Sequence, residues 1–263
     1  MTKYYTDEGI EKLRDAYADL RGRRMRLQQR CMEFSFGNDR AKEYAVHGFS
    51  RRLSGLVRCI ENTFSAIPPE LESVPASDAT HDAEIQVQAF IINVFGCLDN
   101  LAWMWVLERN ITKPNGAPVP PEWVGLRAAN TLVRASLGEE LRRYLEGTAE
   151  WLEYLEDYRH ALAHRIPLYV PPFAIDPKNE GRYRELEEAI TRLVIQGHLE
   201  EAEALKTERD GLKFFRPFIA HSWSQARPMQ FHIQMLADFK TIEAISAKLL
   251  DELRDLASAR NAD

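Results

Sequence analysis

Hydrophobic positions recur every three to four residues over long stretches of this chain, and this spacing predicts helices. Proline disrupts a helix interior because it lacks an N–H donor and clashes with the preceding turn. The thirteen prolines leave five long proline-free segments: 1–67, 76–113, 122–166, 178–216 and 229–263. Within these segments the pattern places helices near 7–34, 40–66, 79–110, 125–137, 139–165, 179–207 and 230–260. We therefore expect an all-α helical bundle.

Two segments are predicted to be extended. Residues 166–173 (IPLYVPPF) contain three prolines, and a residue that precedes proline is biased away from the helical region. Residues 214–221 (FFRPFIAH) are aromatic and β-branched and also contain a proline. We expect these two segments to pair as a small ribbon that flanks a helical hairpin at 179–213.

The third predicted helix contains the most apolar segment of the chain, AFIINVFGCLDNLAWMWVL at 89–107. Nineteen such residues are nearly enough to span a bilayer. However, Asp99 lies in the middle of the segment, where a membrane would make a charge costly. The segment therefore predicts the long buried central helix of a bundle and no membrane partner. Ser77 or Asp78 is expected to cap this helix, and Gly96 indicates the close approach of a neighbouring helix.

Composition narrows the class of protein without giving its function. Of 263 residues, 45% are hydrophobic and 28% are charged, with a formal net charge of −6. These values are typical of a folded globular protein and exclude a disordered chain or a generic nucleic-acid coat. The three cysteines are widely separated, which favours reduced thiols over a disulfide framework. The N-terminus lacks the apolar stretch of a signal peptide, so we expect a cytoplasmic location.

The candidate chemistry lies at the end of the fifth predicted helix, in the sequence YRHALAHR at 158–165. His160 and His164 are four residues apart and share one helix face, as two metal ligands would. The surrounding sequence has no HExxH pattern and no suitably placed carboxylate, so we expect no metal. A second interpretation is a basic helix end, where His and Arg side chains complement the helix dipole.

The third interpretation is a family resemblance. Arg159, His160 and His164 resemble the R-φ-x(4–6)-H motif of the HEPN superfamily, with His160 at φ; four residues separate Arg159 from His164 when φ is counted among them. The stretches LDNLAW at 98–103 and YRHALAHRIPLYVPP at 158–172 are similar to an uncharacterised bacterial HEPN-like group. HEPN domains are all-α bundles, which agrees with the helical pattern.

The resemblance implies metal-independent RNA cleavage without a cofactor, in a homodimer that brings two motifs together. In this hypothesis His164 transfers protons and Arg159 stabilises charge on the phosphate, while His160 donates or orients. Many members of the superfamily are non-catalytic. The alternative function is therefore a non-catalytic helical interaction or scaffold protein in which the motif is structural. A cognate antitoxin or another partner protein is expected with either function.

The resemblance also implies a division of the chain. We expect a single domain, 1–263, with a HEPN-like core at about 79–172. A helical-hairpin insertion follows at about 173–228, and a C-terminal helix at 229–263 completes the domain.

Asp99 and Asn100 are the predicted supporting residues. A buried carboxylate needs a partner, and Arg159 or His164 is the expected partner of Asp99. Asp99 would then orient the site. Equally, it could form one half of a structural ion pair or accept a hydrogen bond from an aromatic side chain.

An RNA site also needs a basic surface. Residues 1–67 carry 13 Lys and Arg against 9 Asp and Glu, a net of +4 in an otherwise acidic chain. The candidate RNA-binding side chains are Arg21, Arg23, Arg24, Arg26 and Arg30. The favoured alternative is a solvated helix face paired with the acidic residues at 146–157. His221 and Trp223 follow the second extended segment and are expected to lie near the motif.

Overall fold

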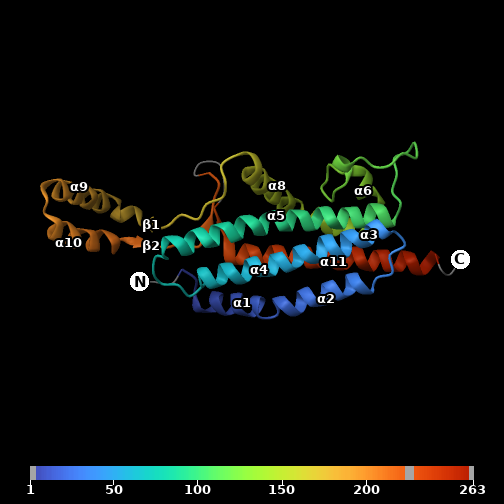
Figure 1. Cartoon of the computed structure of the whole chain (residues 1–263), viewed down its shortest axis with the longest axis horizontal. Coiled ribbons are helices and arrows are strands. Elements are labelled where there is room, and N and C mark those ends of the chain that lie inside the picture. Colours follow the sequence, from blue (N-terminus) through green and yellow to red (C-terminus); the bar gives the residue numbers. More distant parts are fainter. Residues whose placement is uncertain (1–3, 223–227, 261–263) are drawn as a thin grey trace.

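The computed structural model describes residues 4–222 and 228–260, with side chains up to Ser258. Of the described residues, 72% are helical and only 5% are in strands. The chain is therefore an all-α bundle, as the hydrophobic pattern predicts (Figure 1).

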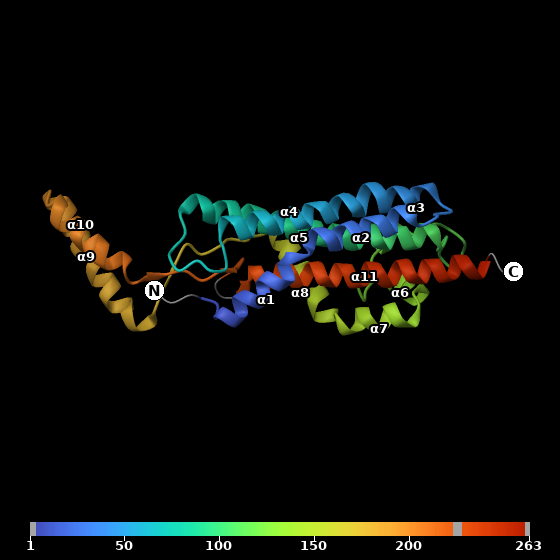
Figure 2. The ribbon, with the colours of Figure 1, turned by 90° about the horizontal axis from the view of Figure 1, so that it is seen from below.

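The longest helix, α5, lies at the centre of the bundle, and other helices pack along it (Figures 1 and 2). Its main neighbours are α4, α11 and α8, and α2 covers the outer side of α4. The helices are α1 (Asp7–Ala18), α2 (Leu20–Glu33), α3 (Asp39–Glu43), α4 (Ser50–Ala66), α5 (Ser77–Glu108), α6 (Thr131–Ser136), α7 (Glu139–Gly147), α8 (Ala149–His164), α9 (Glu180–Gln196), α10 (Leu199–Asp210) and α11 (Phe231–Arg260). A π-helical turn, η1 (Tyr44–Phe49), joins α3 to α4, and short 3₁₀ turns lie at η2 (Pro121–Trp123) and η3 (Pro177–Asn179).

Besides the predicted helix 40–66, which contains the π-helical turn η1, three predicted helices are broken by a residue whose backbone is not right-handed helical. The helix predicted at 7–34 breaks at Asp19, and the one predicted at 139–165 breaks at Thr148. Both residues have nearly the same non-helical backbone, with φ near −109° and ψ near 19°. The helix predicted at 179–207 turns at Gly197, whose positive φ of 81° suits glycine. The resulting hairpin of α9 and α10 projects from one end of the bundle (Figures 1 and 2).

The predicted helix 125–137 is wrong in its first half, because only α6 (Thr131–Ser136) is α-helical there. Asn130 ends the preceding turn: its side chain donates to the Trp123 carbonyl at 3.0 Å and lies against Gly125. A local hydrogen bond of this kind offers the backbone an alternative to helix.

The central helix is buried as predicted. By length and composition α5 could cross a membrane, yet 72% of its most apolar window is buried by the rest of this chain. Trp105, Phe90 and Leu101 are among its fully buried side chains. Gly96 does permit a close approach, because a Cβ there would lie 2.3 Å from the guanidinium carbon of Arg52 on α4.

The expected side-chain cap of α5 is wrong. The helix begins at Ser77 after Ala76, and neither Ser77 nor Asp78 makes a capping hydrogen bond to the backbone. Thr80 instead donates its hydroxyl to the Ala76 carbonyl at 3.2 Å.

The predicted ribbon is confirmed in a short form. Tyr169 and Ala220 exchange two backbone hydrogen bonds of 3.0 and 3.2 Å, which join the two predicted extended segments. Next to them, β1 (Ala174–Ile175) pairs antiparallel with β2 (Lys213–Phe214) at the base of the hairpin. A second pair, β3 (Phe218–Ile219) with β4 (Met229–Gln230), leads into α11.

Two buried polar side chains connect α11 to the rest of the bundle. Asp238 is 1% exposed and accepts hydrogen bonds from Trp151 of α8 at 2.7 Å and from Gln234 at 2.6 Å. Burial raises the pKa of Asp238 to about 7. His232 is fully buried between the Tyr5 hydroxyl and the Ile67 carbonyl, and burial lowers its pKa to about 4.

These two pKa shifts predict a pH-dependent stability with a definite sign. Between about pH 4 and 7 the folded state keeps a proton on Asp238 that the unfolded state releases, so stability falls as pH rises. The His232 contribution has the opposite sign and is complete above its unfolded pKa of 6.5. From pH 6.5 to 8, Asp238 should reduce the free energy of unfolding by roughly 1 kcal/mol relative to a protein that lacks this carboxyl, because the remaining His232 contribution is the same in both proteins. Urea denaturation at both pH values should show this loss in the wild type and not in Asp238→Asn; an equal loss in both proteins would contradict the assignment.

Candidate functional site

The candidate motif lies at the C-terminal end of α8. This helix buries Leu152, Leu155, Tyr158 and Ala161, which recur at helical spacing and face the bundle. The helix ends at His164, because Arg165 has a non-helical backbone and Pro167 follows. The buried face fixes the rotation of α8 and therefore the direction of each motif side chain.

His160 and His164 lie side by side on the outer part of α8. Their ring centroids are 6.4 Å apart, His164 is exposed, and the His160 side chain is 42% exposed. The His160 Nε2 is 3.9 Å from a Glu156 carboxylate oxygen, and that carboxylate also forms an ion pair with Arg127. Over the described residues there is no cluster of three or more His, Cys, Asp or Glu side chains that could hold a metal.

Arg159 points in a different direction, toward α5. Its guanidinium carbon lies 4.5 Å from the ring centroid of Phe95, in cation–π geometry. Within residues 4–222 and 228–260 it forms no ion pair with a carboxylate and donates no hydrogen bond. Its planar set of N–H donors, which matches the oxygens of a phosphate, is therefore available to a ligand.

The expectation of a buried and paired Asp99 is wrong. Asp99 is exposed, one turn beyond Phe95 on α5, and it makes no hydrogen bond or ion pair with a described residue. The surrounding protein removes part of its water and raises its pKa, while the positive charges of Arg159, Arg127 and Arg52 oppose this effect. Asp99 thus lies near three arginines without contacting them.

Asn100 lies on another face of α5, away from the motif. It is 7% exposed and packs against Gly48 of η1, where a Cβ would lie 2.7 Å from its Oδ1. The two adjacent supporting residues therefore belong to different surroundings, because successive helix positions point about 100° apart.

The motif residues are also divided by the helix geometry. At 3.6 residues per turn, His160 and His164 point about 40° apart, whereas Arg159 and His164 point about 140° apart. One subunit therefore presents both imidazoles on one face and the guanidinium on another.

Four of the five candidate RNA-binding arginines are engaged in ion pairs. Arg23 and Arg30 contact Glu243 and Asp251 on α11, and these two pairs join α2 to α11. The other two pairs join Arg21 to Glu61 and Arg26 to Asp19. Arg24 has a buried Nε without a hydrogen-bond partner among the described residues. The carboxylates that pair with this cluster are not those of the acidic run at 146–157, so that part of the alternative is wrong.

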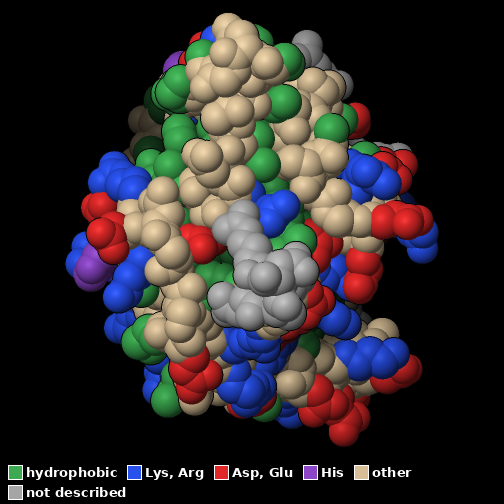
Figure 3. Space-filling view, turned by 90° about the vertical axis from the view of Figure 1, so that its right-hand side faces the viewer, with side chains coloured by type: hydrophobic (Ala, Val, Ile, Leu, Met, Phe, Trp, Pro, Cys, Tyr) green, Lys and Arg blue, Asp and Glu red, His purple; other side chains and the backbone are tan. Residues whose placement is uncertain are grey.

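Charge is mixed on the end of the molecule that Figure 3 shows. Lys and Arg side chains lie among Asp and Glu side chains over the lower part and the sides of this view, whereas its upper part is largely uncharged. A polyanion approaching this end would meet both signs of charge, and repulsion from the carboxylates would reduce its attraction.

His221 does lie beside the motif, as expected from its place after the ribbon. Its Nε2 is 2.9 Å from Asp157, and its ring packs edge-on against Tyr158 at 5.2 Å. Asp157 also accepts from Arg165 at 3.2 Å. The prediction for Trp223 falls outside the described residues.

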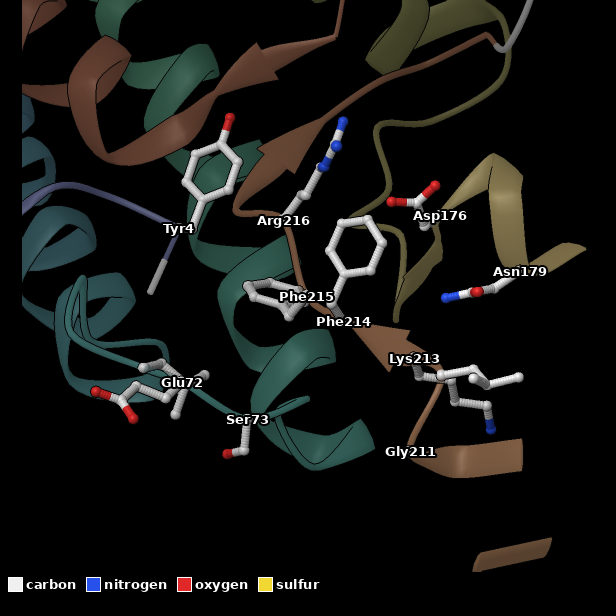
Figure 4. Close-up of a pocket in the computed structure, with 12 residues that line it drawn as sticks. Tyr4, Glu72, Ser73, Asp176, Asn179, Gly211, Lys213, Phe214, Phe215 and Arg216 are labelled. Atoms are coloured by element: carbon white, nitrogen blue, oxygen red, sulfur yellow. The ribbon is translucent and has the colours of Figure 1, made fainter. Parts of the chain in front are cut away.

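One cavity of the molecule is not predicted by the sequence pattern. It has a volume of about 410 Å³ and lies at the base of the hairpin of α9 and α10. In Figure 4, Phe214 and Phe215 lie between Tyr4 on one side and Asp176 and Asn179 on the other. Its lining comes from four separate segments of the chain, none of which carries a recognisable motif.

Comparisons with known proteins add no relative. No model of a protein family matches the chain, and neither a curated protein nor a solved structure matches it. The function is therefore inferred from the residues and their geometry.

The exposure of Asp99 leads to a prediction about stability. Because the carboxylate makes no hydrogen bond or ion pair with a described residue, Asp99→Leu should change the free energy of unfolding by less than about 0.5 kcal/mol. Chemical denaturation of both proteins at pH 7 measures the difference. A loss above about 1.5 kcal/mol would show that Asp99 has a stabilising partner after all.

Proposed function

We propose that this chain is a HEPN-like protein that cleaves RNA without a metal, as an RNase of toxin or defence type. The observation that supports this best is that the Arg159 side chain has no carboxylate partner among the described residues. Its guanidinium is positioned over Phe95 and lies one residue from His160 on α8. A guanidinium without a protein partner can bind a phosphate without first giving up an ion pair.

The chemistry assigns a role to each motif residue. His164 is exposed and would take the proton from a ribose 2′-OH or give one to the leaving 5′-oxygen. Arg159 would bind the phosphate oxygens and stabilise the charge that develops on them. His160, beside His164, would donate a hydrogen bond to the same phosphate. The products would be a 2′,3′-cyclic phosphate or 3′-phosphate and a 5′-OH.

The proposal includes a homodimer in the cytoplasm. Since Arg159 and His164 point about 140° apart on one helix, a single α8 does not direct both at the same phosphate from one face. A two-fold axis near α8 would bring Arg159 of one subunit toward His164 of the other, and two-fold symmetry is the commonest in oligomers. A cognate antitoxin or other partner protein would act by covering this face.

One observation favours the alternative of a non-catalytic interaction protein. The contact of Arg159 with Phe95 joins α8 to α5 within one subunit, as a purely structural arginine would. In that case the arginine contributes to helix packing, and the two histidines are surface residues of a helix end.

A cleavage assay separates the two functions. We expect His164→Ala and Arg159→Ala each to lower the rate of cleavage of a single-stranded RNA by at least a hundredfold, because each removes a group that acts in the transition state. His198→Ala is the matched control, since His198 is exposed on the distant hairpin and pairs only with Glu201 in the described part of the chain. The assay should contain EDTA, and gel analysis should identify the cyclic phosphate. Equal rates for all four proteins would place any activity elsewhere.

Mixing variants tests whether the site is shared between subunits. Neither the Arg159→Ala dimer nor the His164→Ala dimer should cleave RNA alone. After exchange of subunits, each mixed dimer contains one intact site out of two, so activity should return to about a quarter of the wild-type value. The fraction follows from random pairing, in which half of the dimers are mixed. Sedimentation as a monomer, or no recovery in the mixed dimers, would rule out a shared site.

A further inference from the structure

A second candidate site lies at the π-helical turn η1, which packs against α5. This turn interrupts an otherwise continuous helix from α3 to α4, and the Ser50 amide reaches back five residues to the Ala45 carbonyl. The Ser50 hydroxyl donates to the same carbonyl at 2.9 Å. Turns of this kind are rare and occur frequently at functional sites.

The floor of the site is the Asn100 side chain. Asn100 is 93% buried, being 7% exposed, and its Oδ1 has no hydrogen-bond partner among the described residues. Gly48 leaves the room that the amide occupies, because a Cβ there would lie 2.7 to 2.9 Å from the amide atoms. A buried amide oxygen without a partner is costly. The oxygen is enclosed, so a donor on a ligand removes that cost when the amide turns its oxygen toward the pocket.

The wall of the site is basic. Arg51 is exposed, and its Nη2 is 3.3 Å from His47 Nδ1. Like Arg159, Arg51 forms no ion pair with a carboxylate in the described part of the chain. Arg40, on α3, lies over the ring of Tyr44 and pairs with Glu43. Two arginines against one carboxylate leave a net positive charge beside His47.

These residues line one pocket of about 270 Å³ that opens between α3, η1 and α5. Its volume lies below the roughly 300 to 1,000 Å³ that is typical of sites for drug-sized ligands, so it suits a small group. Its only carboxylate, that of Glu43, is already paired with Arg40, which does not favour a cation.

We propose that this pocket binds a ribose-phosphate group, either in a free nucleotide or in an RNA chain. The phosphate lies on the Arg51 guanidinium, whose planar donors fit two of its oxygens. A ribose hydroxyl donates to the Asn100 Oδ1, which gains the partner that it lacks. The site is separate from the motif on α8, so it does not depend on the proposed cleavage.

Titration calorimetry at low salt with ribose 5-phosphate tests the proposal. The wild type should bind saturably and at least tenfold more tightly than it binds inorganic phosphate, because a sugar hydroxyl reaches Asn100 while the phosphate stays on Arg51. Arg51→Ala should weaken binding at least tenfold, and Gly48→Ala should weaken it by displacing the Asn100 amide. Arg58→Ala is the matched control, since Arg58 is an exposed arginine on the same helix and contacts Glu61 at 3.7 Å. It should bind as the wild type does.

Further titrations identify which ligand carries the ribose-phosphate group and distinguish this pocket from the motif on α8. AMP and a single-stranded RNA hexamer are titrated into wild type and Arg51→Ala; the ligand whose binding falls with the substitution is the one that uses the pocket. His164→Ala should bind ribose 5-phosphate normally, so loss of cleavage and loss of this pocket are distinguishable. Thermal melting checks that each variant is folded. Equal affinity for ribose 5-phosphate and phosphate would indicate an adventitious anion only, and wild-type binding by folded Arg51→Ala would equally overturn the proposal.

Discussion

The burial of α5 is the constraint on which the rest of the structure depends. This helix is apolar around most of its circumference, so it must be covered by several helices at once. α4, α11 and α8 supply that cover, with η1 beside them. Two adjacent polar residues of α5 lie where this covering layer changes from one helix to another. Asp99 is at the surface near α8, and Asn100 is buried beneath the π-helical turn. Both candidate sites therefore lie at the edges of the layer of helices that covers α5.

The hydrophobic pattern predicts the existence of the helices much better than their ends. Proline-free segments identify every long helix, and the prolines near 167–172 correctly predict the extended ribbon. The break at Asp19 has no proline or glycine beside it, so an ordinary residue adopts the non-helical backbone there. At Thr148 the preceding residue is Gly147, a local signal that the long apolar pattern of 139–165 outweighs in the prediction. Tertiary packing decided the boundary at Asp19, and a single sequence carries little information about it.

The candidate site was predictable only where a local pattern determines it. Four-residue spacing places His160 and His164 side by side without any knowledge of the fold. The exposure of Asp99 depends instead on how α8 and α4 cover α5, and no local sequence pattern determines that arrangement. The partners of Arg23 and Arg30 are 220 and 221 residues away along the chain, so their ion pairs were equally out of reach.

The pairing of the arginines distinguishes the basic groups of this acidic chain from one another. Exposed ion pairs contribute at most about 1 kcal/mol each, but a phosphate that binds at Arg23 or Arg30 must still compete with a carboxylate already in place. Arg159 and Arg51 have no such competitor among the described residues, although both lie in a chain with a net charge of −6. An anion is therefore attracted to particular side chains, and the overall charge has little influence at close range because salt screens distant charges within about 10 Å. Two arginines without carboxylate partners, each beside a histidine, indicate more about ligand binding than the larger cluster on α2 does.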